Sequence, residues 1–137
     1  MTDLAYAVRF GGSPDAAVTA IGEALQRRGF GVLATLHVDT ILREKIQQEI
    51  EPLILLEVCS PRHAYRALTA VPDVALLLPC KIVVRRRRNE TEVVLLRPEA
   101  TIGTLLDQSS LRTIAKEVET VLRAVLDEVG APPPRPA

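Results

Sequence analysis

Aromatic residues and cysteine are scarce in this 137-residue sequence. It contains no tryptophan, two tyrosines, two phenylalanines and two cysteines. Proteins that hold single-stranded nucleic acid use aromatic side chains as stacking platforms, and this chain has few to offer. The two cysteines are expected to be reduced thiols, as in a cytoplasmic protein.

The sequence also lacks a long apolar run and an overall charge. No run approaches the roughly 20 residues that a membrane helix needs, and the start shows no basic segment followed by an apolar one, as a signal peptide would. We therefore expect a cytoplasmic domain without a membrane partner. The formal net charge is zero, and only residues 81–98 are clearly basic, with a net charge of +4. A local excess of this kind disfavours a broad nucleic-acid-binding face.

Length and composition predict one globular domain. A chain of this length is typical of a single domain, and its hydrophobic content of 47% is ordinary. We predict that residues 1–131 form this domain and that the proline-rich residues 132–137 form a disordered tail.

The spacing of apolar residues predicts the secondary structure. Alternation indicates strands, and a repeat of three to four residues indicates helices. Serine followed by proline marks two helix starts, because serine caps a helix and proline suits its first turn. In the first half of the chain we expect a strand over 4–10, a helix from Ser13-Pro14 to Gly29, a strand over 30–38, a short helix capped by Asp39 and a strand over 53–59. A helix then starts at Ser60-Pro61, and a strand over 74–88, interrupted at Pro79, leads through a turn at Asn89-Glu90 to a strand over 92–97. The chain ends with a connector over 99–108, which has one helical turn, and a helix from Ser109 or Ser110 to Gly130.

This β-α-β-α-β-α-β-β-α order predicts an α+β fold. The closing hairpin favours a single-domain, two-layer sandwich whose five-stranded sheet is largely antiparallel or mixed, with the helices on one face. The other sheet face would then stay partly apolar. A large exposed apolar face is normally an association surface, so we expect a homodimer. The residues expected on this face are Leu33, Leu53, Leu55, Val83 and Leu95.

Both cysteines lie where an apolar run meets a proline. Cys59 ends a predicted strand and precedes the helix that starts at Ser60-Pro61, and Cys80 directly follows Pro79. A thiol at a helix N-terminus is favoured as thiolate, and His63 would lie one turn along that helix. Cys59, His63 and Cys80 are therefore the candidate catalytic residues. The candidate ligand-binding residues are Cys59, Ser60, His63, Tyr65, Pro79 and Cys80.

A purely structural interpretation of the same residues is also concrete. Cys59 and Ala64 occupy the two positions of a hydrophobic staple around the Ser60 cap, and cysteine often packs as a small hydrophobe. Strand alternation also places Cys80 and Cys59 on opposite sheet faces unless the strand ends bend. Two cysteines and one histidine leave a zinc ion without a fourth ligand. We predict no metal and no cofactor.

The run Arg85-Arg86-Arg87-Arg88 is the other conspicuous feature. Alternation divides these side chains between the two sheet faces, so a charged strand end that discourages aggregation is favoured over an anion or nucleic-acid site. Hydrolase and metalloprotease motifs are missing, since the sequence contains neither G-x-S-x-G nor H-E-x-x-H.

Three segments resemble one known family. They are Gly29–Leu33, Leu56–Pro61 with Ala64 and Tyr65, and Leu76–Val84 with its Leu-Pro-Cys sequence. Together they resemble domain-of-unknown-function family 302 over roughly residues 5–125. The resemblance implies a small α+β domain that forms a homodimer. It implies no activity and no catalytic residue.

Two hypotheses for function follow. In the first, the chain is a non-enzymatic dimeric binding or accessory domain that holds a small ligand or a protein partner near the strand ends at Cys59 and Cys80. In the second, it is a thiol-dependent redox or sulfur-transfer protein with Cys59 as nucleophile, Cys80 as resolving thiol and His63 as base. The missing catalytic motifs favour the first.

Overall fold

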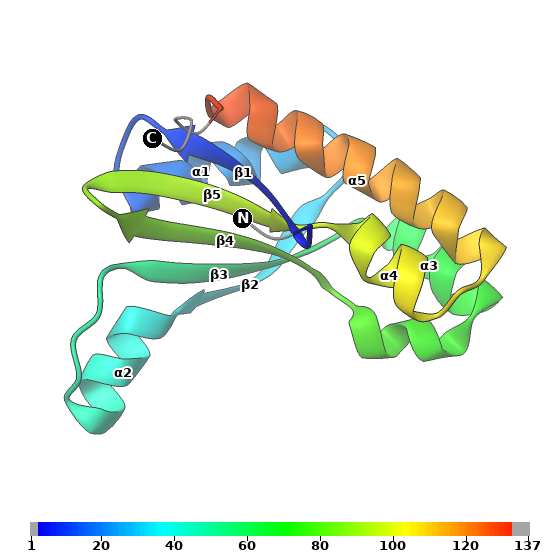
Figure 1. Ribbon diagram of the computed structural model, residues 1–137, viewed down its shortest axis with the longest axis horizontal. Helices are drawn as coiled ribbons and strands as arrows, with labels where there is room; N and C mark the ends of the chain where they lie inside the picture. The colour runs from blue at the N-terminus through cyan, green and yellow to red at the C-terminus, as the bar shows by residue number, and fades with distance from the viewer. Residues whose placement is uncertain (1–2, 133–137) are drawn as a thin grey trace.

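Residues 3–132 are described by the computed structural model. They form a five-stranded sheet with the order β1-β5-β4-β3-β2, in which every neighbouring pair is antiparallel (Figure 1). The strands are β1 (Ala5–Phe10), β2 (Gly31–His37), β3 (Leu53–Cys59), β4 (Cys80–Arg87) and β5 (Glu90–Leu96). The helices are α1 (Pro14–Gln26), α2 (Val38–Ile46), α3 (Pro61–Ala70), α4 (Ile102–Leu105) and α5 (Ser109–Val129), with 3-10 turns η1 (Pro72–Leu77) and η2 (Pro98–Ala100).

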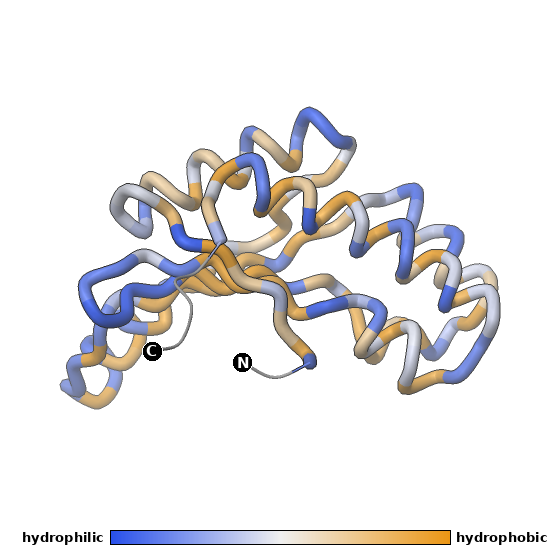
Figure 2. Tube along the Cα trace, turned by 45° about the horizontal axis from the view of Figure 1, so that its top comes forward, coloured by the Kyte–Doolittle hydropathy of each residue, from blue (hydrophilic) through white to orange (hydrophobic). Residues whose placement is uncertain are grey.

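Helices α1 and α5 pack on one face of the sheet and α3 packs against α5, which confirms the two-layer α+β sandwich (Figure 1). The apolar residues concentrate along the strands and the helix sides that face them (Figure 2). Strand β3 lies inside the sheet, between β4 and β2: Ile54, Leu56 and Val58 are buried toward the helices, and the residues between them are half-buried. Helix α2 projects from the body, and none of its residues is buried.

Both serine–proline helix starts are confirmed. The Ser13 Oγ accepts a hydrogen bond from the Ala16 N–H at 3.1 Å, and Pro14 is the first residue of α1. The Ser60 Oγ accepts from the His63 N–H at 3.5 Å, and Pro61 is the first residue of α3. These caps satisfy N–H groups that have no partner within the helix. The second cap also turns the chain sharply away from β3.

Three local predictions are wrong. Residues 74–77 wind into η1 instead of extending, because Pro72 sets a helical φ and the Val74 N–H donates to the Val71 carbonyl at 3.0 Å. The hairpin turn is Arg88-Asn89, one residue earlier than predicted, and both residues have the positive φ that a two-residue turn requires. Asp39 does not cap α2, since the helix starts at Val38 and the Asp39 carboxylate accepts from the Leu53 N–H at 3.1 Å.

The sheet face opposite the helices carries a continuous apolar row. Register places five residues side by side across the strands: Ala7, Val94, Val83, Leu55 and Leu36. Leu95 is not among them, contrary to prediction, because it pairs with Ile82 and is fully buried under the helices. We refer to the five-residue row as the open-face row.

Among residues 3–132, none of the helices has both the length and the hydropathy that a membrane span requires.

Candidate functional site

The strand register brings the two cysteines to neighbouring positions. Cys80 is the first residue of β4 and is the antiparallel partner of Val58, the residue just before Cys59. Strands lie about 4.8 Å apart and rise about 3.3 Å per residue, which places the two cysteine Cα atoms about 6 Å apart. Residues 21 positions apart in the sequence are thus on neighbouring strands, close to one another in the sheet.

Cys59 and Cys80 line one apolar cavity. It has a volume of about 30 Å³, room for a guest about the size of one water molecule, and lies between the ends of β3 and β4 and the helices α3 and α5. Its walls are mostly aliphatic and alanine side chains. The lining residues are Phe30, Val58, Cys59, Ser60, His63, Ala64, Ala67, Leu78, Pro79, Cys80, Ile102, Ile114, Ala115 and Val118.

The strand-alternation objection applies to the side-chain directions, although both residues border the cavity. Cys80 keeps the alternation of Ile82 and packs against the core beneath the helices. Cys59 is the last residue of β3, and the chain turns from it through Ser60 into α3. Cys59 still pairs with Gly31 of β2, so alternation turns its side chain away from those of Val58 and Cys80, although the residue borders the cavity.

His63 lines the cavity but is held by other groups. Its Nδ1 lies 2.8 Å from the Ser60 Oγ, and its Nε2 lies 3.6 Å from a carboxylate oxygen of Glu117. Its ring stacks on Phe30 with a centroid separation of 5.8 Å. Within residues 3–132, no hydrogen bond joins this imidazole to either thiol. The geometry therefore does not pair His63 with Cys59 as base and nucleophile.

The other two candidate residues lie in different surroundings. Pro79 forms part of the cavity wall next to Cys80. Tyr65 lies outside the cavity, with 73% of its surface exposed, in a shallow groove between α3 and α5. Its position one residue past the apolar stripe of α3 turns it toward solvent.

Both thiols are neutral at physiological pH. Burial, with smaller contributions from the nearby Cys59 thiol and the Glu57 carboxylate, raises the pKa of Cys80 to about 12. Burial also raises the pKa of Cys59. The expected activation of Cys59 by the α3 N-terminus is therefore outweighed by burial, and the Ser60 side chain already occupies a free N–H group of that helix end.

The described part of the chain holds no group of three or more histidine, cysteine or acidic residues suited to a metal ion. Both cysteines are free.

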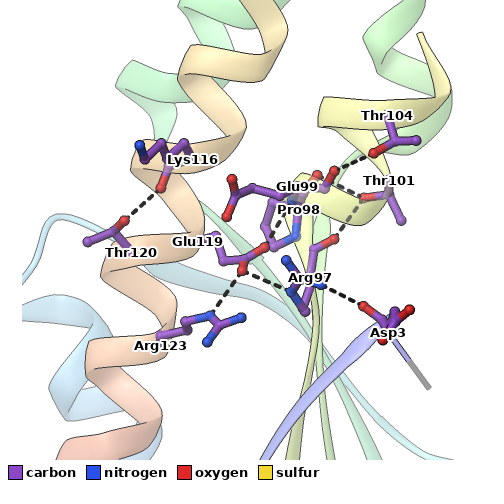
Figure 3. Close-up of polar contacts among 10 residues, drawn as sticks. All are labelled: Asp3, Arg97, Pro98, Glu99, Thr101, Thr104, Lys116, Glu119, Thr120 and Arg123. Atoms are coloured by element: carbon purple, nitrogen blue, oxygen red, sulfur yellow. Dashed lines mark hydrogen bonds and ion pairs between the residues drawn. The ribbon is translucent and has the colours of Figure 1, made fainter. Parts of the chain in front are cut away.

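Sequence reasoning missed a buried carboxylate that positions the cavity wall. Glu119 of α5 is 2% exposed and accepts from Arg97 at 3.0 Å, from Arg123 at 2.9 Å and from the Glu99 N–H at 3.0 Å (Figure 3). The cluster ties α5 to the end of β5 and to η2. Since Val118 lines the cavity, the same cluster fixes one wall of it.

A signal for this cluster exists in the sequence. Glu119 falls within the apolar stripe of α5, four residues after Ala115 and three before Leu122, both of which are fully buried. An acidic residue at a core-facing position requires a buried partner. That partner, Arg97, is 22 residues away and could not be identified from spacing.

The run Arg85–Arg88 lies at the hairpin end of β4, where it is partly paired with acidic residues. Arg85 binds Glu92 on the neighbouring strand at 3.0 Å, and Arg87 and Arg88 are exposed at the hairpin.

Fold and site together define a small α+β domain whose helix layer and sheet end enclose an apolar, two-thiol cavity. The chain belongs to DUF302, a domain family of unknown function, whose model matches residues 6–129. It is similar to the crystal structure of an uncharacterized conserved DUF302 protein from Bacillus stearothermophilus, with 31% identity and a TM-score of 0.88, covering 93% of this chain and 99% of that chain. No curated protein matches the chain.

Proposed function

We propose that this protein is a non-enzymatic, dimeric binding domain that holds a small, largely apolar ligand in the cavity between Cys59 and Cys80. The observation that carries the proposal is the cavity itself, which brings two neutral thiols into an otherwise apolar wall. Binding sites are typically apolar pockets with a few placed polar groups. Here the polar groups are the thiols, Ser60 and His63.

The alternative, a redox or sulfur-transfer protein with Cys59 as nucleophile, has less support. A nucleophilic cysteine needs a lowered pKa, and burial raises the pKa of both thiols. The imidazole of His63 contacts Ser60 and Glu117 rather than a thiol.

Xenon is a suitable probe for the cavity, because dry apolar cavities bind it. The 129Xe chemical shift should move on addition of the wild-type protein and should move far less with the A64L variant, whose added side chain fills the cavity. The matched control is A70L, the same change on an exposed residue of the same helix. A response equal in wild type and A64L would refute the proposal.

The dimer is proposed to form through the open-face row, with a second copy of this chain as the partner. The row is flanked on one side by the Glu57–Lys81 pair at 3.2 Å and on the other by the Arg85–Glu92 pair at 3.0 Å. Each flank carries both signs of charge, so a copy related by a two-fold axis meets complementary charges. An isologous interface of this kind is the commonest in homo-oligomers.

Sedimentation equilibrium tests this interface. We expect the wild-type chain to sediment as a dimer and L55R, which places a charge in the centre of the row, to sediment as a monomer. L76R is the control, because Leu76 is 82% exposed on η1, away from the row. A wild-type monomer at all concentrations, or a dimer unaffected by L55R, contradicts the proposed interface.

A further inference from the structure

We propose that residues 38–51, which we call the arm, bind the β4–β5 hairpin of a second copy of this chain. The arm consists of α2 and the segment that leads from it to β3. The inference rests on the dimer proposed above and names the segment by which each copy holds its partner. It also assigns a role to the arginine run, which the cavity does not use.

The open-face row alone is too small for a stable interface. Leu36 is exposed, but Ala7, Val83 and Leu55 are half-buried and Val94 is buried. A stable interface takes about 20–30 residues from each partner. A dimer that forms through this row therefore needs further contacts.

The arm carries exposed apolar side chains next to the row. Half of the ten large apolar residues that are exposed within residues 3–132 lie in the short stretch 33–50. Ile46, the last residue of α2, is 56% exposed, and Ile41 and Ile50 are also exposed. A helix of nine residues is marginal by itself, and most helices in proteins are stabilised by packing of their apolar side. A partner that covers this side of α2 supplies that packing.

The arm has a fixed direction relative to the sheet. The Asp39 carboxylate accepts a hydrogen bond from the Leu53 N–H at 3.1 Å, and Arg43 binds Glu49 at 2.9 Å. Figure 1 shows that α2 projects past the β2 edge of the sheet, away from α1 and α5. An arm in this position can reach a second copy that packs on the open face.

Charge favours the hairpin of a second copy as the surface that the arm meets. The arm contains four acidic and two basic residues, a net charge of −2. At the hairpin, Arg9 and Arg85 are each paired with a carboxylate of β5. Arg87 and Arg88 are exposed and have no ion pair within residues 3–132, so two positive charges remain at the hairpin tip. Opposite charges favour a contact between arm and hairpin, whereas a negative arm is repelled by an anionic membrane surface.

A two-fold axis that runs along the strands brings the two surfaces together. Leu53 begins β3 just after the arm and pairs with Arg85, so arm and hairpin lie at the same end of the sheet. When two sheets stack face to face about such an axis, their ends coincide and their strand orders run in opposite directions. The arm at the β2 edge of one copy then lies at the hairpin end of the partner's sheet, on the side of its β1 edge. The partner's arm makes the same contact in return, as an isologous interface requires.

Charge reversal tests the contact. Sedimentation equilibrium should show that R87E/R88E and E44K/E51K each dimerise at least about tenfold more weakly than the wild type, because each variant places like charges at both contacts. In a 1:1 mixture of the two variants, both contacts of the heterodimer again join opposite charges. The heterodimer should therefore be at least about tenfold tighter than the geometric mean of the two homodimer affinities. Native mass spectrometry with one variant labelled with 15N identifies it.

The matched control is E23K/D73K, which makes the same change in net charge at exposed residues of α1 and η1. This variant should dimerise like the wild type. Its heterodimer with R87E/R88E keeps one favourable contact and one reversed contact, so its affinity should equal the geometric mean of the two homodimer affinities within about threefold.

Two results would overturn the inference. One is that either reversed variant dimerises as tightly as the wild type. The other is an equal gain in both mixtures, which general attraction between opposite net charges would produce. The L55R experiment keeps the two proposals separate: a dimer that L55R dissociates but charge reversal leaves intact removes only the arm contact, whereas a wild-type monomer removes the dimer itself.

Discussion

In the C59S variant at pH 8, native Cys80 is expected to react with iodoacetamide about 100-fold more slowly than the same residue in the urea-unfolded chain. A pKa of about 12 leaves about 1000-fold less thiolate at pH 8 than the ordinary thiol pKa of about 8.5. The more basic thiolate is intrinsically about 30-fold more nucleophilic, which offsets part of this loss. The remaining difference between the native and unfolded alkylation rates should be measurable by mass spectrometry of timed samples.

The pH dependence provides the internal control. The native rate should rise about tenfold per pH unit from pH 8 to pH 11, where an ordinary thiol has already levelled off. The folded chain holds this proton more tightly than the unfolded chain does, so the contribution of Cys80 to stability is present below about pH 8.5 and is lost as the pH rises toward 12. A native rate within about threefold of the unfolded rate would contradict the burial of Cys80.

Replacing Glu119 with alanine is expected to lower the free energy of unfolding by about 3–5 kcal/mol. The change leaves the half-buried Arg97 guanidinium without its carboxylate partner, and removing one member of a buried ion pair has a cost of this size. The control is E117A on the same helix. Glu117 pairs with Arg66 at the surface, at 2.6 Å, so its loss should cost far less than the loss of Glu119. Urea unfolding of both variants measures the difference.

The stability of the fold at low pH should also depend on the Glu119 cluster. Burial alone would raise the pKa of Glu119, but hydrogen bonds from Arg97, Arg123 and the Glu99 N–H together lower it. A carboxylate with a lowered pKa stabilises the fold above its unfolded pKa of about 4.3, and this contribution disappears as the pH falls through the folded value. The wild-type chain should therefore lose stability below pH 4 more steeply than E119Q. Equal slopes, or equal costs of E119A and E117A, would show that the cluster is not a buried anchor.

Much of the fold follows from local sequence patterns. The apolar run of β3 and the two serine–proline caps are short-range features, and each depends on residues close together in the sequence. The path from α3 to β4 was predicted wrongly because an apolar run such as Val74–Leu78 suits either a strand or a buried turn. Only the tertiary position of Val74, buried beside the core cluster, distinguishes the two.

The candidate site was predictable only in part. The two cysteines stood out because each ends an apolar run beside a proline, but their adjacency depends on the antiparallel register of β3 and β4. Both residues border one cavity because the chain turns from Cys59 through Ser60 into α3 beside it, and the sequence does not show where that helix packs. Glu119 was missed because its partner is supplied by a distant strand end. The predicted tail over residues 132–137 lies, apart from Pro132, outside the described residues.

Diffraction from xenon-pressurised crystals of the wild-type protein tests the binding cavity most directly. We expect an anomalous xenon peak enclosed by Cys59, Cys80, Ala64 and Val118, and no such peak in crystals of A64L. Xenon bound only elsewhere, or a peak between these residues that persists in A64L, would contradict a two-thiol cavity that binds a small apolar ligand.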